Sequence, residues 1–346
     1  MHARLIDWLR VAVVSAALGL CLSGVPAQAA QDESQVAAEA AQAGLVQPGN
    51  NAPAYREARR GEDQSITFRA PADRRMIQSE GQTWRAARNG PLTVWGGWLL
   101  AGVFLAIAAF YLWRGKITLE GQPTGRLIQR FSSVERMAHW TVAGCFVILA
   151  LSGLTMLFGK HVLLPVVGYT LFSWLAWAAK NLHNLVGPLF FAAILLFMAL
   201  FAKDNVWHAV DALWIRKAGG LLSGEHVPSW RFNFGEKTWF WFGVVMLGLA
   251  VSITGMILDF PGNGQTRQNM QLAHIIHATL AVLFMAMSLG HIYIGTLGME
   301  GAMDSMRTGY VDEVWAKEHH EYWYREAKGE SLPRNYTPPR GAEPAH

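Results

Sequence analysis

Five long apolar runs constrain the fold of this chain more than any other feature. They cover residues 94–113, 138–158, 182–202, 239–258 and 272–298. At 1.5 Å per helical residue, each run is long enough to cross about 30 Å of hydrocarbon. Only 16% of the residues are charged, well below the roughly one quarter of a soluble domain. The sequence therefore predicts an all-α membrane protein and excludes an ordinary cytosolic enzyme.

Charge and cysteine content exclude two further classes of protein. The net charge is only +4, and no nucleic-acid-binding motif accompanies it, so no nucleic-acid partner is predicted. The two cysteines, Cys21 and Cys145, both lie within apolar stretches. Their placement predicts neither a disulfide framework nor a cysteine-held iron–sulfur cluster.

The N-terminal segment has the layout of a secretory signal. Residues 1–29 combine a basic start, a short apolar core and the small pair Ala27 and Ala29, which predicts cleavage after Ala29. A retained transmembrane helix is the alternative interpretation. Residues 30–92 are polar and are predicted to form an external segment before the first transmembrane helix at 93–113.

The distribution of basic residues sets the predicted orientation. With an external start and five spans, the loop 114–137, the loop 203–238 and the tail 299–346 are cytoplasmic. These two loops are richer in Lys and Arg than the external loops, as the positive-inside rule requires. A sixth apolar stretch, 162–178, is predicted to be a separate interfacial or external helix, because a sixth span would put the basic loop 203–238 outside. We expect a multi-pass protein of the bacterial inner membrane with a periplasmic mature N-terminus.

Four histidines fall at two depths of this predicted bundle. His277 and His291 lie fourteen residues apart in the last run, about 21 Å along a helix and on nearly the same face. The predicted topology places His183, at the start of the third run, beside His277 near the outer surface. It places His139, at the start of the second run, beside His291 near the inner surface.

Two level-matched imidazole pairs predict two b-type haems, each with its iron held between two ring nitrogens. A proton or metal-ion pathway is the alternative, although these runs lack the acidic residues that such pathways usually add. His274 could replace His277 as a ligand, but its fourteenth successor is Ser288, so we predict a supporting position for His274. Small residues in the same runs suit either close approach to a haem or ordinary helix packing. They are Gly144, Gly153, Gly187, Gly248 and Gly255.

Six ordered segments between residues 126 and 325 carry a family resemblance. They read RFSSVERMAHWT, NLHNLVGPLF, FNFGEKTWFW, IIHATLAV, GHIYIGTLGM and WAKEHHEYWYRE. Together they resemble the gamma, cytochrome b subunit of membrane-bound respiratory formate dehydrogenases. The resemblance implies a four-helix di-haem bundle at 138–298 with the same two histidine pairs. The first span and residues 31–92 lie outside it and form an addition to that bundle.

The resemblance also implies quinone reduction beside the inner haem, with quinone contacts at Asn233, Gly235 and His291. Independently, the NFGE segment is predicted at the inner membrane surface, where an amide group can meet a polar headgroup. Capping of the following helix is an equally good role for Asn233. His319 and His320 in the tail could form a metal-binding pair, but a tail that docks against an iron–sulfur subunit fits the resemblance better.

The expected function follows from these features. The chain would pass electrons from an iron–sulfur beta subunit through two b haems to quinone at the cytoplasmic side. It has no molybdenum-binding or iron–sulfur motif of its own, so formate oxidation is expected on a molybdenum- or tungsten-containing alpha subunit. The alternatives are the cytochrome b subunit of a nickel–iron hydrogenase or thiosulfate reductase, and a haem-free membrane anchor.

Overall fold

The computed structural model describes residues 79–220 and 223–332. The predicted signal peptide and most of the predicted external segment lie outside the described residues. Within the described part, five helices are long and apolar enough to cross a membrane. The all-α membrane fold predicted from the five apolar runs is confirmed.

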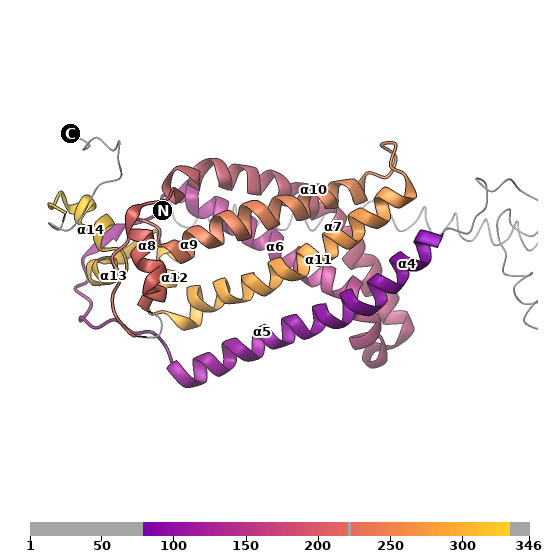
Figure 1. The fold of residues 1–346 in the computed structure, drawn as a ribbon, viewed down its shortest axis with the longest axis horizontal. Coiled ribbons are helices and arrows are strands. Elements are labelled where there is room, and N and C mark those ends of the chain that lie inside the picture. The colour runs from indigo at the N-terminus through magenta and orange to yellow at the C-terminus, as the bar shows by residue number, and fades with distance from the viewer. Residues whose placement is uncertain (1–78, 221–222, 333–346) are drawn as a thin grey trace, which may run out of the picture. The chain divides into compact units, whose positions relative to one another are not determined.

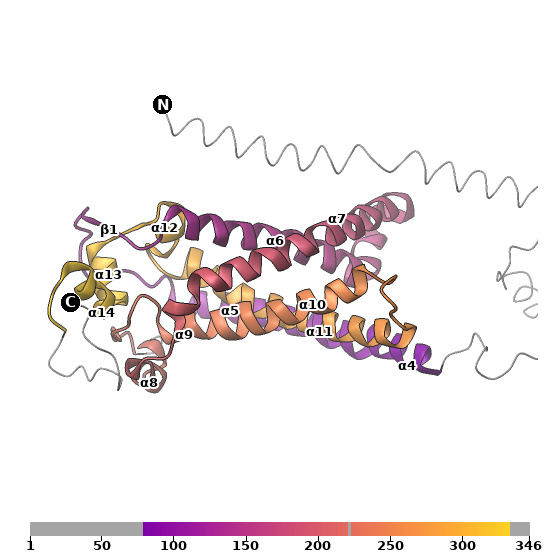
Figure 2. The same cartoon turned by 90° about the horizontal axis from the view of Figure 1, so that it is seen from above.

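The five spans form an up-and-down bundle (Figures 1 and 2). Helix α6 lies beside α7, α10 packs against both α7 and α11, and α5 packs on the far side of α11. Three of the spans contain π-helical turns and are continuous through them. In chain order the segments are α4 (Ser79–Ala87), η2 (Arg88–Leu92), α5 (Thr93–Arg114), α6 (Ser133–Val162), α7 (Leu164–Phe201), α9 (Phe234–Thr238), η5 (Trp239–Leu247), α10 (Gly248–Asp259), α11 (Arg267–Tyr293) and η6 (Ile294–Gly298).

Helix α7 differs from the prediction of a separate helix at 162–178. The structure has a helical segment from Leu164 to Phe201, in which two helices join across a kink at Gly168. Gly168 has φ 76°, which glycine adopts readily because it lacks a Cβ atom. The part after Gly168 is about 50 Å long at 1.5 Å per residue. It therefore extends the third span beyond the hydrocarbon layer and leaves the number of spans at five.

An apolar layer fills the middle of the bundle. Phe284 of α11 lies seven residues from both His277 and His291 and is only 4% exposed. Its ring contacts Phe146 of α6 and Phe190 of α7. The buried members of this layer are Cys145, Val186, Phe190, Ile194, Val244, Leu247 and Phe284. The layer keeps polar groups and water away from the centre of the bundle.

One end of the bundle is covered by a small folded unit that we term the cap. Its strands β1 (Leu127–Gln129) and β2 (Tyr310–Asp312) pair antiparallel. The helices α12 (Ala302–Arg307), α13 (Glu313–His319) and α14 (Glu321–Lys328) complete it (Figure 2). Its apolar core consists of Val311, Trp315, Ala316 and Trp323. The two short strands had no counterpart in the sequence prediction, because three-residue strands carry no readable periodicity.

The segment between α7 and α9 packs at the cap end as well. It contains η3 (Ala202–Asn205), α8 (Ala209–Arg216) and η4 (Ala218–Gly220). Lys237 of α9 forms a buried ion pair with Asp211 of α8 at 2.8 Å, and its Nζ also lies 3.0 Å from His208 Nδ1. Breaking such a buried pair by removing one partner is costly. The pair therefore fixes α8 against the start of the fourth span.

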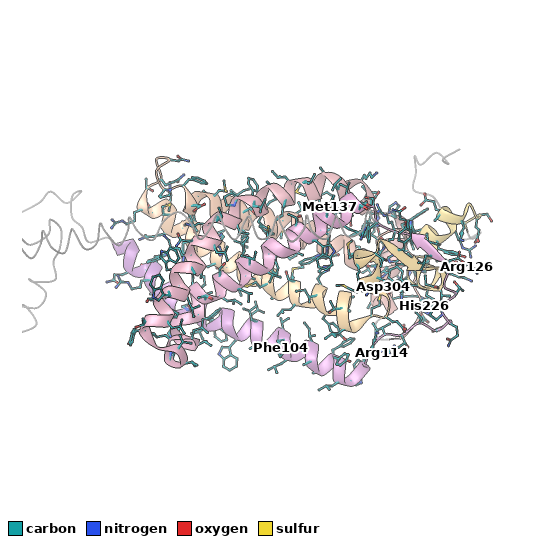
Figure 3. The ribbon with its side chains drawn as sticks, turned by 180° about the vertical axis from the view of Figure 1, so that it is seen from behind. Phe104, Arg114, Arg126, Met137, His226 and Asp304 are labelled. Atoms are coloured by element: carbon teal, nitrogen blue, oxygen red, sulfur yellow. The ribbon has the colours of Figure 1, made fainter. Side chains whose placement is uncertain are left out.

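Helix α5 contacts the bundle along one side only. A Cβ atom at Gly96 would lie 3.4 Å from Val282 of α11, and Phe110 and Tyr111 set their rings edge-on against Tyr293. The other side of α5 exposes large apolar side chains, among them the labelled Phe104 (Figure 3). In a membrane these side chains face lipid.

Candidate functional site

The structure brings the four predicted histidines together in two pairs at different levels of the bundle. The ring centroids of His183 and His277 lie 6.1 Å apart. Those of His139 and His291 lie 6.2 Å apart. The second pair lies at the cap end, and the first pair lies toward the opposite end. The apolar layer around Phe284 separates the two pairs.

The spacing within each pair suits a metal ion held between the two rings. With a metal–nitrogen bond of about 2 Å, two imidazoles on opposite sides of one metal have centroids roughly 6 Å apart. Both pairs have this separation. Neutral imidazole is the form that binds iron in b-type haems.

In the His183/His277 pair, hydrogen bonds determine which nitrogen is free. His277 Nδ1 lies 3.0 Å from the carbonyl oxygen of Val251, which can only accept, so Nδ1 carries the proton. His183 Nδ1 lies 2.8 Å from Ser152 Oγ. The Ser152 hydroxyl donates to the Ile148 carbonyl, so its oxygen accepts from His183. Both rings therefore leave Nε2 with a free lone pair for a metal.

Glycines lie next to the rings of His183 and His277. A Cβ atom at Gly153 would lie 3.5 Å from His183 Cε1, and one at Gly255 would lie 3.2 Å from His277 Cε1. Gly187 follows His183 by one turn on the same face, and a Cβ there would meet no atom within 4 Å. The backbone at Gly187 is thus open to a flat group lying against it. Gly153 and Gly255 thus allow the His183 and His277 rings to pack closely against neighbouring helices, and a role of the glycines beside a haem stays a prediction.

Aromatic rings surround the cap-end pair. Trp239 stacks on His291 with centroids 4.8 Å apart and an interplanar angle of 13°. His139 contacts Trp140 and Phe197, and its buried Nδ1 has no partner among the described residues. His291 stays exposed although it lies within a span. An exposed imidazole at this depth leaves a face available to a bound group.

His274 takes a different position from the four paired histidines. Trp84 Nε1 of α4 lies 3.4 Å from His274 Nδ1, and the two rings meet edge to face. Nearby, Arg88 donates to the Met156 carbonyl of α6. The N-terminal helix is therefore tied to both α6 and α11. Sequence reasoning missed Trp84, because no motif covers residues before 126.

Asn233 and Gly235 lie at the start of α9, and Gly235 precedes Trp239 by one helical turn. Asn233 Oδ1 accepts from Glu236 N at 3.0 Å, and Glu236 Oε2 accepts from Asn233 N at 2.8 Å. Asn233 thus has the capping role that the sequence left open. Gly235 packs on Trp214, where a Cβ would lie 3.0 Å from the indole ring. Contact of these residues with a quinone stays a prediction.

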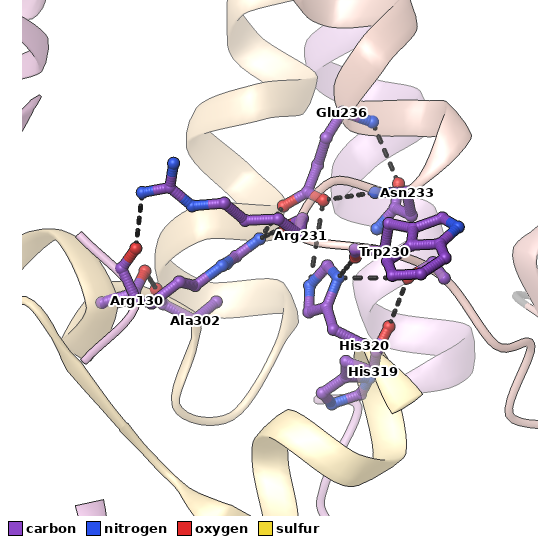
Figure 4. Close-up of polar contacts among 10 residues, drawn as sticks. Arg130, Trp230, Arg231, Asn233, Glu236, Ala302, His319 and His320 are labelled. Atoms are coloured by element: carbon purple, nitrogen blue, oxygen red, sulfur yellow. Dashed lines mark hydrogen bonds and ion pairs between the residues drawn. The ribbon is translucent and has the colours of Figure 1, made fainter. Parts of the chain in front are cut away.

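A cluster of charged residues joins α9 to the cap (Figure 4). The buried Arg130 donates to Glu236 Oε1 at 2.9 Å, and burial lowers its pKa while Glu236 opposes that shift. Arg231 forms ion pairs with Glu135 and Asp204. Sequence reasoning missed this cluster, since Arg130 meets Glu236 from 106 residues away and Glu135 meets Arg231 from 96 residues away along the chain.

The tail histidines pack against their own chain. His320 is 1% exposed and its Nδ1 lies 2.8 Å from the Trp230 carbonyl oxygen (Figure 4). Burial lowers the pKa of His320 well below its ordinary value, and lowers that of His319 to about 4. Within the described residues no group of three or more His, Cys, Asp or Glu side chains could hold a metal ion. The geometry therefore gives no support to a metal pair at His319 and His320.

Comparison with known proteins adds to this geometry. The profile described as prokaryotic cytochrome b561 matches residues 130–309, which include all four paired histidines. The formate dehydrogenase cytochrome b556(fdo) subunit of Escherichia coli K12 is 30% identical over 210 residues, which cover 58% of this chain and 93% of that protein. The nitrate-inducible cytochrome b556(Fdn) subunit of the same organism is 28% identical over 212 residues, covering 58% and 92%. The cytochrome b556 subunit from Haemophilus influenzae Rd is 26% identical, covering 58% and 83%.

Proposed function

Because this chain belongs to the prokaryotic cytochrome b561 family, we propose that it is the haem-carrying, quinone-reducing subunit of a formate dehydrogenase. Its relatives are named as cytochrome b556 subunits of formate dehydrogenase. The observation that carries the proposal is the pair of imidazole sites, with centroids 6.1 and 6.2 Å apart, at two levels of one apolar bundle.

The four histidines would hold two b haems by their Nε2 atoms. A b-type haem supplies an iron centre that takes up and releases single electrons. Hydrogen bonds from Nδ1 to Val251 and Ser152 fix the orientation of the His277 and His183 rings, as outer partners of metal-bound histidines generally do. The apolar layer around Phe284 keeps water from the space between the two sites.

We place the cap on the cytoplasmic side, because the basic loops 114–137 and 203–238 lie at that end. An iron–sulfur subunit would then deliver electrons to the His183/His277 site from the outer face. A molybdenum- or tungsten-containing subunit would oxidise formate. This chain would carry the electrons inward to the His139/His291 site.

Quinone would be reduced beside His291, at the cap end. Asn233 and Gly235 begin the helix whose next turn carries Trp239 against His291. The exposed face of His291 and the start of α9 therefore belong to one corner of the bundle. Protons for the quinol would come from the cytoplasm, so turnover would add to the proton-motive force.

The test is spectroscopy of the purified complex, with haem and metals quantified per chain. We expect about two b haems per chain, both reduced by formate, and a co-purifying molybdenum or tungsten subunit. Haem reduction by hydrogen instead of formate would identify a hydrogenase subunit, and quinol-dependent thiosulfate reduction would identify a thiosulfate reductase subunit. A complex that is intact but contains no haem would refute the proposal in favour of a membrane anchor.

A further inference from the structure

A buried imidazole and a carboxylate lie close to each other at the cap end. His320 Nε2 lies 3.8 Å from Glu236 Oε2. His320 Nδ1 must carry the ring proton, because the Trp230 carbonyl oxygen 2.8 Å away can only accept. The Ser229 hydroxyl, 3.1 Å from the same nitrogen, donates to the His319 carbonyl and so cannot donate to Nδ1. In neutral His320, Nε2 therefore directs a lone pair at a carboxylate oxygen.

This juxtaposition is a binding place for one proton. Two acceptors that face each other at 3.8 Å gain a shared hydrogen bond when a proton or a proton-bearing molecule enters between them. Arg130 donates to the other carboxylate oxygen, Glu236 Oε1, at 2.9 Å. Burial lowers the pKa of His320 well below its ordinary value, and the nearby Arg130 lowers it further. A proton on His320 Nε2 is consequently held weakly and is easily released.

The charged and titratable groups around the pair come from every element packed on it. Arg130 precedes α6, Arg231 precedes α9, and His319 ends α13. Arg231 is itself engaged by Glu135 and Asp204. Within the described residues, Glu236 is thus the acidic side chain that faces His320 directly.

The pair adjoins the proposed quinone site. Glu236 precedes Trp239 by three residues, so the two side chains project from the same face of the helix. Trp239 stacks on His291, and Glu236 Oε2 also accepts a hydrogen bond from the backbone N–H of Asn233. The Glu236 side chain is 35% exposed. A carboxylate so placed can reach a headgroup at the start of α9.

On its other side, the pair connects toward the surface of the cap. A surface cavity of about 420 Å³ is lined by Gly121, His226, Val314, Lys317, Glu318 and Glu321. His226 lies 3.3 Å from Glu120 and 3.9 Å from Glu318, and its ring meets that of His319 with centroids 6.0 Å apart. Figure 3 shows His226 at the cap end of the molecule. Titratable groups thus follow one another from the cavity to His319 and His320.

We propose that Glu236 and His320 form a proton-loading pair that supplies quinone reduction from the cytoplasm through the His226 cavity. The proposal rests on the proposed function. Quinone takes up two electrons, one at a time from the His139/His291 site and ultimately from the iron–sulfur partner. It also takes up two protons to become quinol. Each proton leaves the pair toward the quinone oxygen and is replaced from the cytoplasm.

The experiment compares three single variants of the complete complex in membranes. Glu236→Gln keeps an acceptor for the Asn233 amide, since Glu and Gln serve equally at this position of a capping box. His320→Gln removes the second acceptor of the pair. Glu225→Gln is the matched control, because Glu225 is exposed and, among the described residues, forms an ion pair with Lys217 alone. Haem content, formate-driven haem reduction, binding of a quinone analogue and quinol formation between pH 5 and 8 are measured for each.

The expected result separates proton supply from electron supply. In Glu236→Gln and His320→Gln, formate reduces both haems as fast as in the native complex and the analogue binds as tightly. The rate of quinol formation falls at least about tenfold, since a positioned proton donor typically contributes a factor of 10² to 10⁴ to the rate. The rate falls further as the pH rises. Glu225→Gln retains the native rate.

Native quinol formation in both variants at every pH would overturn the proposal. Loss of analogue binding in step with quinol formation would also overturn it, because the residues would then be binding groups. If Glu236→Gln lost haem, the His320→Gln data would decide alone. Failure of the native complex to reduce quinone would instead refute the proposed function itself.

Discussion

The two histidine pairs have nearly equal ring separations but are supported in different ways. At the His183/His277 site, each ring donates its Nδ1 proton to a neighbouring helix and rests against a glycine. At the cap end, His291 lies under the Trp239 indole and His139 Nδ1 has no partner among the described residues. One site is held by hydrogen bonds and the other by aromatic contact and the cap.

This difference predicts a direction for electron flow. A hydrogen bond from Nδ1 to an oxygen acceptor makes the imidazole a stronger donor to the metal, which favours the oxidised iron and lowers the reduction potential. His183 and His277 both have such a bond, so their site should have the lower potential. Electrons would then move spontaneously toward the cap.

Among the expected effects, the largest should come from removing single histidines, because each removal should empty one of the two sites. We expect His183→Ala to lose one haem and His291→Ala to lose the other, because each site depends on two ligands. His291→Ala should also abolish quinone reduction. Haem per chain and reduced-minus-oxidised spectra measure both outcomes.

The matched control for these variants is His161→Ala, since His161 is an exposed histidine at the end of α6. It should keep two haems. Retention of both haems in His183→Ala would show that the pairing is wrong.

Acidification should destabilise the cap. Burial lowers the pKa of His319 to about 4 and that of His320 well below 6.5. The unfolded chain binds protons at these residues below about pH 6.5 and the folded chain does not, so stability is lost as the pH falls from 6.5 toward 4. Each histidine accounts for up to about 1.4 kcal/mol per pH unit.

Hydrogen exchange of α13 and α14 at pH 7 and pH 5, corrected for intrinsic rates, measures this loss. The double variant with His319→Gln and His320→Gln should have a flatter pH dependence. Equal protection of the cap at both pH values would contradict the prediction.

The smallest effect is expected from one hydroxyl. Ser152→Ala removes the acceptor of His183 Nδ1, which is worth about 1 kcal/mol or roughly 40 mV for a one-electron couple. The potential of that haem should rise, and the potential of the cap-end haem should not change. A redox titration followed at the haem bands measures both.

Ser252→Ala is the matched control for Ser152→Ala. Ser252 is a buried serine in α10 whose hydroxyl has no partner among the described residues. Its removal should leave both reduction potentials unaltered. An equal shift in potential in the two variants would show that Ser152 does not act through its hydrogen bond with His183.

The spans and the histidine pairing could be predicted from the sequence because both depend on local periodicity. Apolar length gives a span, and a spacing of fourteen residues brings His277 and His291 to one face of a single helix. The distribution of basic residues between the loops then sets the direction of each span, and that direction decides which histidines lie at the same depth. No contact between distant segments had to be known.

The cap could not be predicted, because it depends on contacts across the whole chain. Arg130, Glu236 and His320 are brought together only by the packing of strands and helices around them. The continuation of 162–178 into the third span was also missed, since the break at Gly168 is confined to one residue. The Trp84–His274 contact was unpredictable because α4 lies outside the motifs.

An odd number of crossings has a practical consequence for labelling. Five membrane crossings would place residue 79 and residue 332 on opposite sides of the bilayer. A thiol-reactive reagent that cannot enter lipid would therefore modify a cysteine introduced at only one of these positions in intact cells, and the other would react only after the membrane is opened. Fusion reporters at the two positions would fluoresce in different compartments.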